Sequence, residues 1–173
     1  FNDMMWQING FTAYAYQLMG AAPEHADNVK LLGDLAKSTA AYKASFDEIV
    51  ATQRALGHTP EEGLQGELRA AVHGVEKALE AITLHPEMQA KMLMMRRHEK
   101  DFMLREDPEY LAKLNDRVAE FRAFPLTNYL SLPQKRDIDA LLTQYQTAFT
   151  AYVDQAMKAK DLRMALTAEF DVA

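Results

Sequence analysis

The sequence predicts an all-α protein, and the spacing of its apolar residues is the main reason. Over most of the 173-residue chain, apolar side chains recur at alternating intervals of three and four, which places them on one face of a helix. Only seven glycines and six prolines interrupt the chain. We expect an elongated up-and-down helical bundle built as two stacked modules that share long helices, with a single four-helix bundle as the alternative. In either case residues 1–173 form one domain, because no clean linker is visible.

The first two helices are predicted at residues 1–20 and 24–57. The first carries one ionised side chain, Asp3, and ends near Pro23. The second has a bundle-like apolar stripe and ends at Gly57, a residue type that favours helix C-termini. Its stripe comprises Val29, Leu32, Ala36, Thr39, Tyr42, Phe46, Ile49, Gln53 and Leu56.

A third helix is predicted over residues 60–105, with Thr59 as its N-cap and Glu62 completing a capping box. Pro86 is expected to kink it. An unbroken helix of this length would extend about 70 Å at 1.5 Å per residue, which favours an elongated shape. Its stripe comprises Leu64, Leu68, Ala71, Val75, Ala78, Ile82, His85, Gln89, Met92, Arg96, Glu99 and Met103.

Two further helices are predicted at residues 107–123 and 133–173, joined by a loop that contains Pro125 and Pro133. Asp107 begins the first of them. The predicted core positions of the helix at residues 107–123 are Leu111, Leu114, Val118 and Phe121. Those of the last helix are Ile138, Leu142, Tyr145, Phe149, Tyr152, Ala156, Ala159, Arg163, Leu166 and Phe170.

Composition and motifs argue against several classes of function. The net charge of −6 and the pI of about 5.4 disfavour a nucleic-acid partner, which would need a basic face. There is no cysteine and no run of about 20 apolar residues that could span a bilayer. Phosphate-binding loops and nucleophile elbows are missing, and His98-Glu99 is followed by Phe102 where a zinc-protease helix needs a second histidine. We therefore expect no enzymatic activity, metal or cofactor in this chain.

Six consecutive charged residues, RRHEKD at positions 96–101, interrupt the apolar pattern. Because a helix turns once every ~3.6 residues, the run covers all of its faces and at least one charge must point toward the core. Arg96 and Glu99 fall on the core stripe, and we expect them to be buried and paired. The alternatives are that Arg96 contacts a ligand or that the run is a solvated face.

The same segment carries a family resemblance. Residues 95–105 (MRRHEKDFMLR) and 63–76 (GLQGELRAAVHGVE) resemble the extracytoplasmic sensor regions of bacterial methyl-accepting chemotaxis receptors of the helical bimodular type. Similar regions occur in membrane sensor histidine kinases. The repeated pattern Tyr-x3-Phe-x3-Val, which begins at Tyr42 and again at Tyr145, supports this resemblance over about residues 30–155.

The resemblance implies a sensor that binds a small organic acid through inward-facing basic residues. The first predicted helix offers no Arg or Lys, so Arg96, Arg97 and Lys100 are the candidate basic groups. We add the two tyrosine hydroxyls of the repeated pattern. We also add Arg69 and His73, which with Glu76 follow one another at i, i+4 and i+7 along one helical face. The candidate ligand-binding residues are therefore Arg96, Arg97, Lys100, Tyr42, Tyr145, Arg69 and His73.

The resemblance also implies location and partners. We expect a domain on the periplasmic side of the bacterial inner membrane, with a transmembrane helix before Phe1 and another after Ala173. The receptor would be a homodimer, with weak dimerisation of the isolated domain. Its interface would use the first helix, where Trp6, Phe11 and Tyr14 could meet a partner without desolvating a charge. A non-enzymatic bundle that docks a protein partner is the alternative function.

Overall fold

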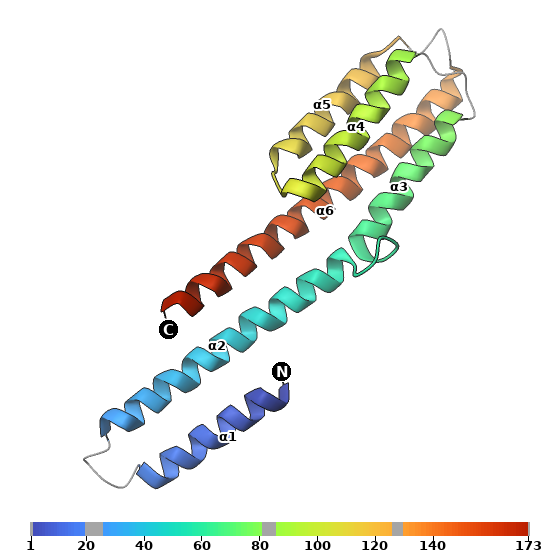
Figure 1. Ribbon diagram of the computed structural model, residues 1–173. Coiled ribbons are helices and arrows are strands. Elements are labelled where there is room, and N and C mark those ends of the chain that lie inside the picture. The colour runs from blue at the N-terminus through green and yellow to red at the C-terminus, as the bar shows by residue number, and fades with distance from the viewer. Residues whose placement is uncertain (1, 20–25, 81–85, 126–129, 173) are drawn as a thin grey trace. The chain divides into compact units, whose positions relative to one another are not determined.

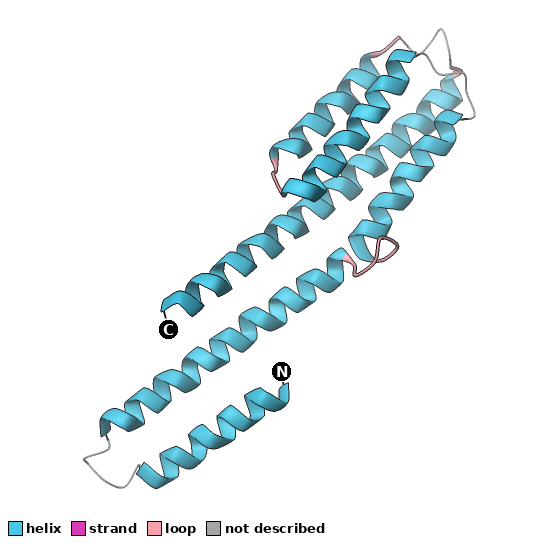
Figure 2. Ribbon diagram, viewed as in Figure 1, coloured by secondary structure: helices cyan, strands magenta, loops and turns pink. Residues whose placement is uncertain are grey.

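The computed structural model describes residues 2–19, 26–80, 86–125 and 130–172, and this part of the chain is almost entirely α-helical. It contains six helices and no β-strand (Figures 1 and 2). The helices are α1 (Asn2–Met19), α2 (Ala26–Leu56), α3 (Gly63–Glu80), α4 (Pro86–Arg105), α5 (Glu109–Ala123) and α6 (Leu132–Val172). The prediction of an all-α helical bundle is confirmed.

Two compact units divide the chain, one made of residues 1–50 and 162–173 and the other of residues 51–161. Both α2 and α6 supply residues to each unit. The stacking of two modules and the elongated shape stay predictions. None of the described helices combines the length and the apolar character needed to cross a membrane.

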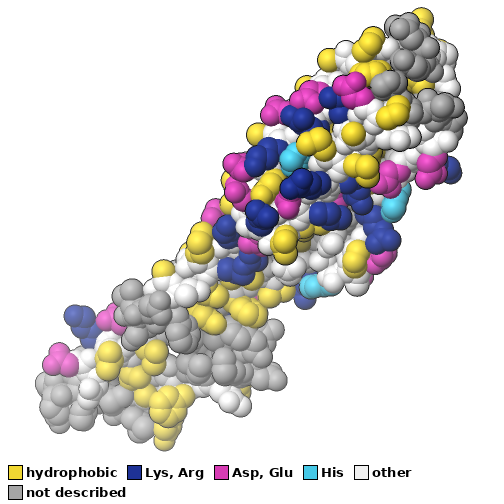
Figure 3. All heavy atoms as spheres, turned by 45° about the horizontal axis from the view of Figure 1, so that its top comes forward, with side chains coloured by type: hydrophobic (Ala, Val, Ile, Leu, Met, Phe, Trp, Pro, Cys, Tyr) yellow, Lys and Arg dark blue, Asp and Glu magenta, His cyan; other side chains and the backbone are white. Residues whose placement is uncertain are grey.

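The unit of residues 51–161 is an up-and-down arrangement of four helices. Its helices α3, α4, α5 and the first part of α6 lie side by side and alternate in direction (Figure 1). Charged side chains of both signs are interspersed over the face that Figure 3 shows. Its core is formed by buried apolar side chains from every helix, chief among them Leu68, Val72, Val75, Met88, Met95, Phe102, Leu114, Val118, Phe121, Leu142, Tyr145 and Phe149.

The other unit contains α1 and most of α2. On α1, Thr12 and Ala15 are buried. The tip of the Tyr16 side chain on α1 lies against Gly33 of α2, so a larger residue at Gly33 would require Tyr16 to shift. The two copies of the Tyr-x3-Phe-x3-Val pattern differ in environment, because Tyr42 is half-buried in this unit whereas Tyr145 is fully buried in the other.

The prediction of one helix over residues 60–105 is wrong. Arg96 Nε lies 3.3 Å from Glu76 Oε1, whereas twenty residues of continuous helix would separate these positions by about 30 Å. The chain therefore reverses direction between α3 and α4, and Pro86 begins α4 instead of kinking a longer helix. Proline suits a first helical turn, where its missing N–H has no intrahelical partner. The predicted stripe residues Ile82 and His85 lie outside the described residues.

The start of α3 also differs from the prediction. Residues 59–62 form a turn in which the Glu62 N–H donates to the Thr59 carbonyl at 3.1 Å, and the helix begins at Gly63. Gly57 and Gly63 both have positive φ, 104° and 55°, a conformation that side-chain-bearing residues rarely adopt. The predicted end of the preceding helix at Gly57 is confirmed, but Thr59 and Pro60 belong to the loop.

Most predicted core positions on α5 and α6 are confirmed, but the predicted stripe residues Gln53 on α2, Gln89 on α4 and Arg163 on α6 are exposed. Gln89 is exposed, because α4 begins afresh at Pro86 and its buried face passes through Met88, Met92, Met95, Glu99 and Phe102. Phe170 lies among the side chains that the structure does not describe.

Two of the helix starts are fixed by side chains. Asp107 Oδ1 accepts a hydrogen bond from the Glu109 N–H at 3.0 Å, as its predicted capping role requires. At α6, the Gln134 side chain accepts from the Ser131 N–H at 3.0 Å, and the Gln134 N–H lies 3.4 Å from Ser131 Oγ. This is a reciprocal capping box that sequence reasoning missed, although the pattern Ser-x-x-Gln was there to be read.

Candidate ligand-binding site

A buried carboxylate stands at the centre of the charged run. Glu99 on α4 is 1% exposed. Arg96 Nη1 donates to both of its oxygens, at 2.6 and 2.8 Å. Lys100 Nζ lies 2.8 Å from Oε1, and the Tyr145 hydroxyl donates to Oε2 at 2.8 Å. The predicted pairing of Arg96 with Glu99 is confirmed, and two further partners join it.

Tyr145 reaches this carboxylate from α6, where it lies on the buried face of the helix. Burial raises the pKa of its hydroxyl far above the ordinary value, and the negative charge of Glu99 raises the pKa further. The hydroxyl therefore remains a donor at any physiological pH. It satisfies a carboxylate oxygen that would otherwise carry a large desolvation cost.

The network around Glu99 joins three helices, because Tyr145 reaches it from α6 and the Arg96 side chain also reaches α3. Its Nε lies 3.3 Å from Glu76 Oε1, and the other oxygen of Glu76 lies 3.0 Å from His73 Nδ1. Partial burial is the largest single effect and lowers the pKa of Arg96, but the charge and hydrogen bond of Glu99, together with Tyr145 and Glu76, outweigh it and raise that pKa. Arg96 is half-buried, not fully buried as the core stripe predicts, because its guanidinium extends from the core toward the edge of α3.

The structure places the other predicted site residues in three different environments. Arg97 is 76% exposed and pairs with Asp101 at 3.6 Å. Arg69 is exposed and pairs with Glu61 at 3.0 Å. Tyr42 belongs to the unit of residues 1–50 and 162–173. The residues brought together around Glu99 and Glu76 are Arg96, Lys100, Tyr145 and His73.

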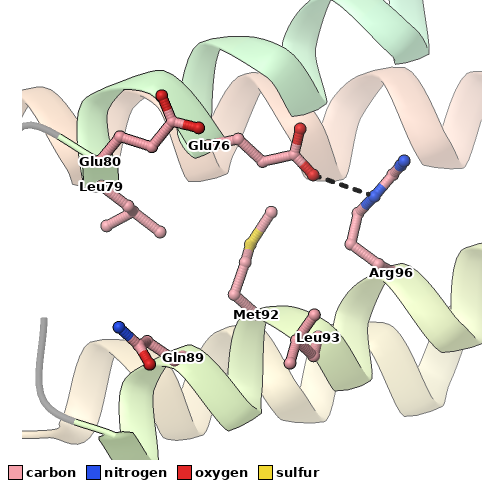
Figure 4. Close-up of a pocket in the computed structure, with 7 residues that line it drawn as sticks. All are labelled: Glu76, Leu79, Glu80, Gln89, Met92, Leu93 and Arg96. Atoms are coloured by element: carbon pink, nitrogen blue, oxygen red, sulfur yellow. Dashed lines mark ion pairs between the residues drawn. The ribbon is translucent and has the colours of Figure 1, made fainter.

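A pocket of about 380 Å³ opens between α3 and α4, with Arg96 in its wall (Figure 4). This volume lies near the lower end of the range of about 300–1,000 Å³ that small-molecule sites occupy. At one end lies the Glu76–Arg96 ion pair, and Glu80 on α3 and Gln89 on α4 lie toward the other end (Figure 4). The pocket is lined by Glu76, Leu79, Glu80, Gln89, Met92, Leu93 and Arg96.

Sequence reasoning missed most of these lining residues. Glu80 follows Glu76 by one helical turn, so the two carboxylates could have been placed on one face. Gln89 and Met92 could not be assigned to the pocket lining from the sequence, because their place there depends on α4 folding back along α3. A second hollow, of about 570 Å³, lies between α3 and α6 and is lined mostly by small side chains, among them Ala70, Gly74, Ala148 and Ala151, with Glu67 as its single charged group.

His98, on the face of α4 toward α5, should make stability depend on pH. Its Nδ1 is buried and has no hydrogen-bond partner within the described part of the chain. Burial lowers the pKa of His98, and Arg117, Lys113 and Arg97 lower it further, against an opposing effect of Asp101. In a range of pH, the His98 ring therefore stays neutral in the folded protein whereas it is protonated in the unfolded chain.

We expect the free energy of unfolding to be highest above the unfolded pKa of 6.5 and to fall as pH drops below it, because the unfolded state then binds more protons. Urea midpoints at about pH 7.5 and 5.5 measure the effect. His98→Gln should remove part of the fall, whereas the exposed His58→Gln should not. An identical pH dependence in wild type and His98→Gln would contradict this prediction.

The described residues offer no group of three or more His, Asp or Glu placed to hold a metal ion. The site presents a set of paired charges beside an apolar wall. Comparison with family models, with curated proteins and with solved structures finds no match for this chain.

Proposed function

We propose that this chain is the extracytoplasmic ligand-sensing domain of a bacterial transmembrane signal-transduction receptor, and that it binds a small molecule between α3 and α4. The observation that carries the proposal is the position of Arg96. This residue lies in the wall of the pocket and also holds the buried Glu99. A ligand that contacts the pocket wall therefore contacts the interior charge network as well.

The resemblance of residues 63–76 and 95–105 to chemoreceptor sensor regions supports the same proposal. The receptor is a methyl-accepting chemotaxis protein or, as the alternative, a sensor histidine kinase, and the domain lies on the periplasmic side of the inner membrane. In this proposal the fragment has no catalytic activity of its own. The organic acid implied by the resemblance is one ligand class to be tested.

Signal output would begin with the helices that the network joins. Arg96 connects α4 to Glu76 on α3, and Tyr145 connects the same network to α6. A ligand that displaces Glu76 from Arg96 would change how α3 is held against α4. The ligand would shift this equilibrium only to the extent that its affinity differs between the arrangement with Glu76 paired to Arg96 and the arrangement with Glu76 displaced.

The expected result of a ligand screen is an increase in melting temperature. A ligand at 100 times its dissociation constant adds about 2.7 kcal/mol of stability, which is roughly 5–10 °C for a chain of this size. The screen should include organic acids, amino acids, amines and sugars, measured by thermal denaturation. No shift with any compound of so broad a panel would contradict the sensing function.

The alternative is a helical bundle that docks a protein partner, and one feature of α1 favours it. Trp6 and Phe11 are 78% and 70% exposed, and Tyr14 is exposed beside them. Large aromatic side chains of this kind are common at protein interfaces. In the sensing proposal this surface is the contact of the receptor homodimer, which membrane attachment would strengthen by raising the effective concentration.

A further inference from the structure

We infer that the pocket between α3 and α4 selects an organic cation, namely a protonated amine carried by a short apolar chain. This inference rests on the proposed sensing function and names the class of its ligand. It departs from the organic acid that the family resemblance implies, and three features of the pocket lead to it.

The first feature is the balance of charge in the pocket lining. Glu76 and Glu80 contribute two negative charges, and Arg96 contributes one positive charge. The net charge of the lining is therefore −1. An anionic ligand would enter beside two carboxylates and be repelled by them, whereas a cation would be attracted.

The second feature is that Arg96 is already occupied. Its Nη1 donates to both oxygens of Glu99, and its Nε lies 3.3 Å from Glu76. Within the described residues no hydrogen bond or ion pair engages the remaining nitrogen, Nη2, so a ligand carboxylate could pair with Arg96 only there, close to the carboxylates of Glu99 and Glu76. Both oxygens of Glu76 are engaged as well, one by Arg96 and the other by His73.

The third feature is a carboxylate that is available. Within the part of the chain that the structure describes, Glu80 takes part in no ion pair or hydrogen bond, and it lines the pocket on the α3 side, at the end away from Arg96 (Figure 4). An ammonium group has three N–H donors and no acceptor. It can donate to the Glu80 carboxylate at this end of the pocket.

The wall between the two ends is apolar and suits the rest of such a ligand. Leu79 and Met92 are buried, and the Leu93 side chain lines the rim. Methionine adapts its shape to the group that it contacts. A short alkyl chain that extends from the ammonium toward Arg96 would bury its methylenes here, and each buried methylene tightens binding by up to about fourfold.

The test compares two probes of equal length and opposite charge, n-hexylammonium and hexanoate, by isothermal titration and thermal shift on the wild-type chain. We expect n-hexylammonium to bind and to raise the melting temperature, ethylammonium to bind more weakly, and hexanoate to give no response. Glu80→Gln should weaken n-hexylammonium at least about tenfold, because it replaces a charged acceptor by a neutral one.

The matched control is Glu67→Gln, an exposed carboxylate on the same helix that lines the hollow between α3 and α6. It should leave the affinity unchanged. Binding of hexanoate without n-hexylammonium would overturn the inference and leave the sensing function standing. Binding of n-hexylammonium that Glu80→Gln does not weaken would overturn the assignment to this pocket. No binding of either probe would also overturn the inference, while the broad ligand screen decides separately on sensing.

Discussion

Arg96→Ala is expected to lower the free energy of unfolding by about 3 kcal/mol, the lower end of the range for a buried charge that loses its partner. The reason is that Glu99 is 1% exposed and that Arg96 makes its shortest contact, 2.6 Å from Nη1 to Oε2. The contact of Lys100 with Oε1 is 2.8 Å. Lys100 and Tyr145 remain after the substitution, which is why we expect the lower end.

The control for this prediction is the neighbouring Arg97→Ala. Arg97 is largely exposed and its ion pair with Asp101 is long, so its loss should cost no more than about 0–1 kcal/mol. Urea denaturation with an unchanged slope would measure both variants. Equal midpoints for the two would show that Lys100 and Tyr145 suffice to stabilise Glu99.

The same variant separates a structural role of Arg96 from a ligand-contacting one. If Arg96 acts mainly through Glu99, stability falls and the remaining folded protein still responds to ligand. Unchanged stability together with a lost ligand-induced thermal shift would instead assign Arg96 to the ligand. No change in either measurement would mean that Lys100 and Tyr145 hold Glu99 without Arg96 and that Arg96 does not contact the ligand.

Phe102→Ala is expected to cost about 3–5 kcal/mol, the usual range for removing a buried phenylalanine. The Phe102 ring is fully buried on α4. It packs edge-to-face against Phe149 and Tyr152 of α6, with ring centres 5.7 and 6.1 Å away. The substitution would leave a cavity one helical turn from Glu99 and would loosen the contact between α4 and α6.

Leu104→Ala is the matched control, because Leu104 lies on the same helix two residues away and is 80% exposed. Its effect should stay within about 0.5 kcal/mol. A loss of less than about 1.5 kcal/mol for Phe102→Ala in urea denaturation would mean that the surrounding side chains close the cavity, which packed cores do only in part.

The all-α fold and the ends of several helices could be predicted from local patterns. Gly57 ends α2 and Asp107 caps α5, because both act through their own backbone neighbourhood. The stripe on α6 also follows from spacing alone, since Ile138, Leu142, Tyr145 and Phe149 recur at helical intervals on a helix that is not interrupted.

The path of the chain at Pro86 could not be predicted in the same way. A proline within a helical pattern is compatible with a kink and with a new first turn, and the two differ only in where the chain goes next. The stripe of residues 64–103 was predicted as continuous, so it placed Gln89 in the core. The reversal between α3 and α4 shifts that face to Met88 and Met92.

The pairing of Arg96 with Glu99 was predictable because the two residues lie three positions apart on one helix, where side chains meet regardless of the rest of the fold. The contacts with Glu76 on α3 and Tyr145 on α6 were not, since each depends on which helices become neighbours. The pocket has the same origin. Glu80 and Gln89 are nine residues apart in the chain, and they line the same pocket because α3 and α4 run back along each other.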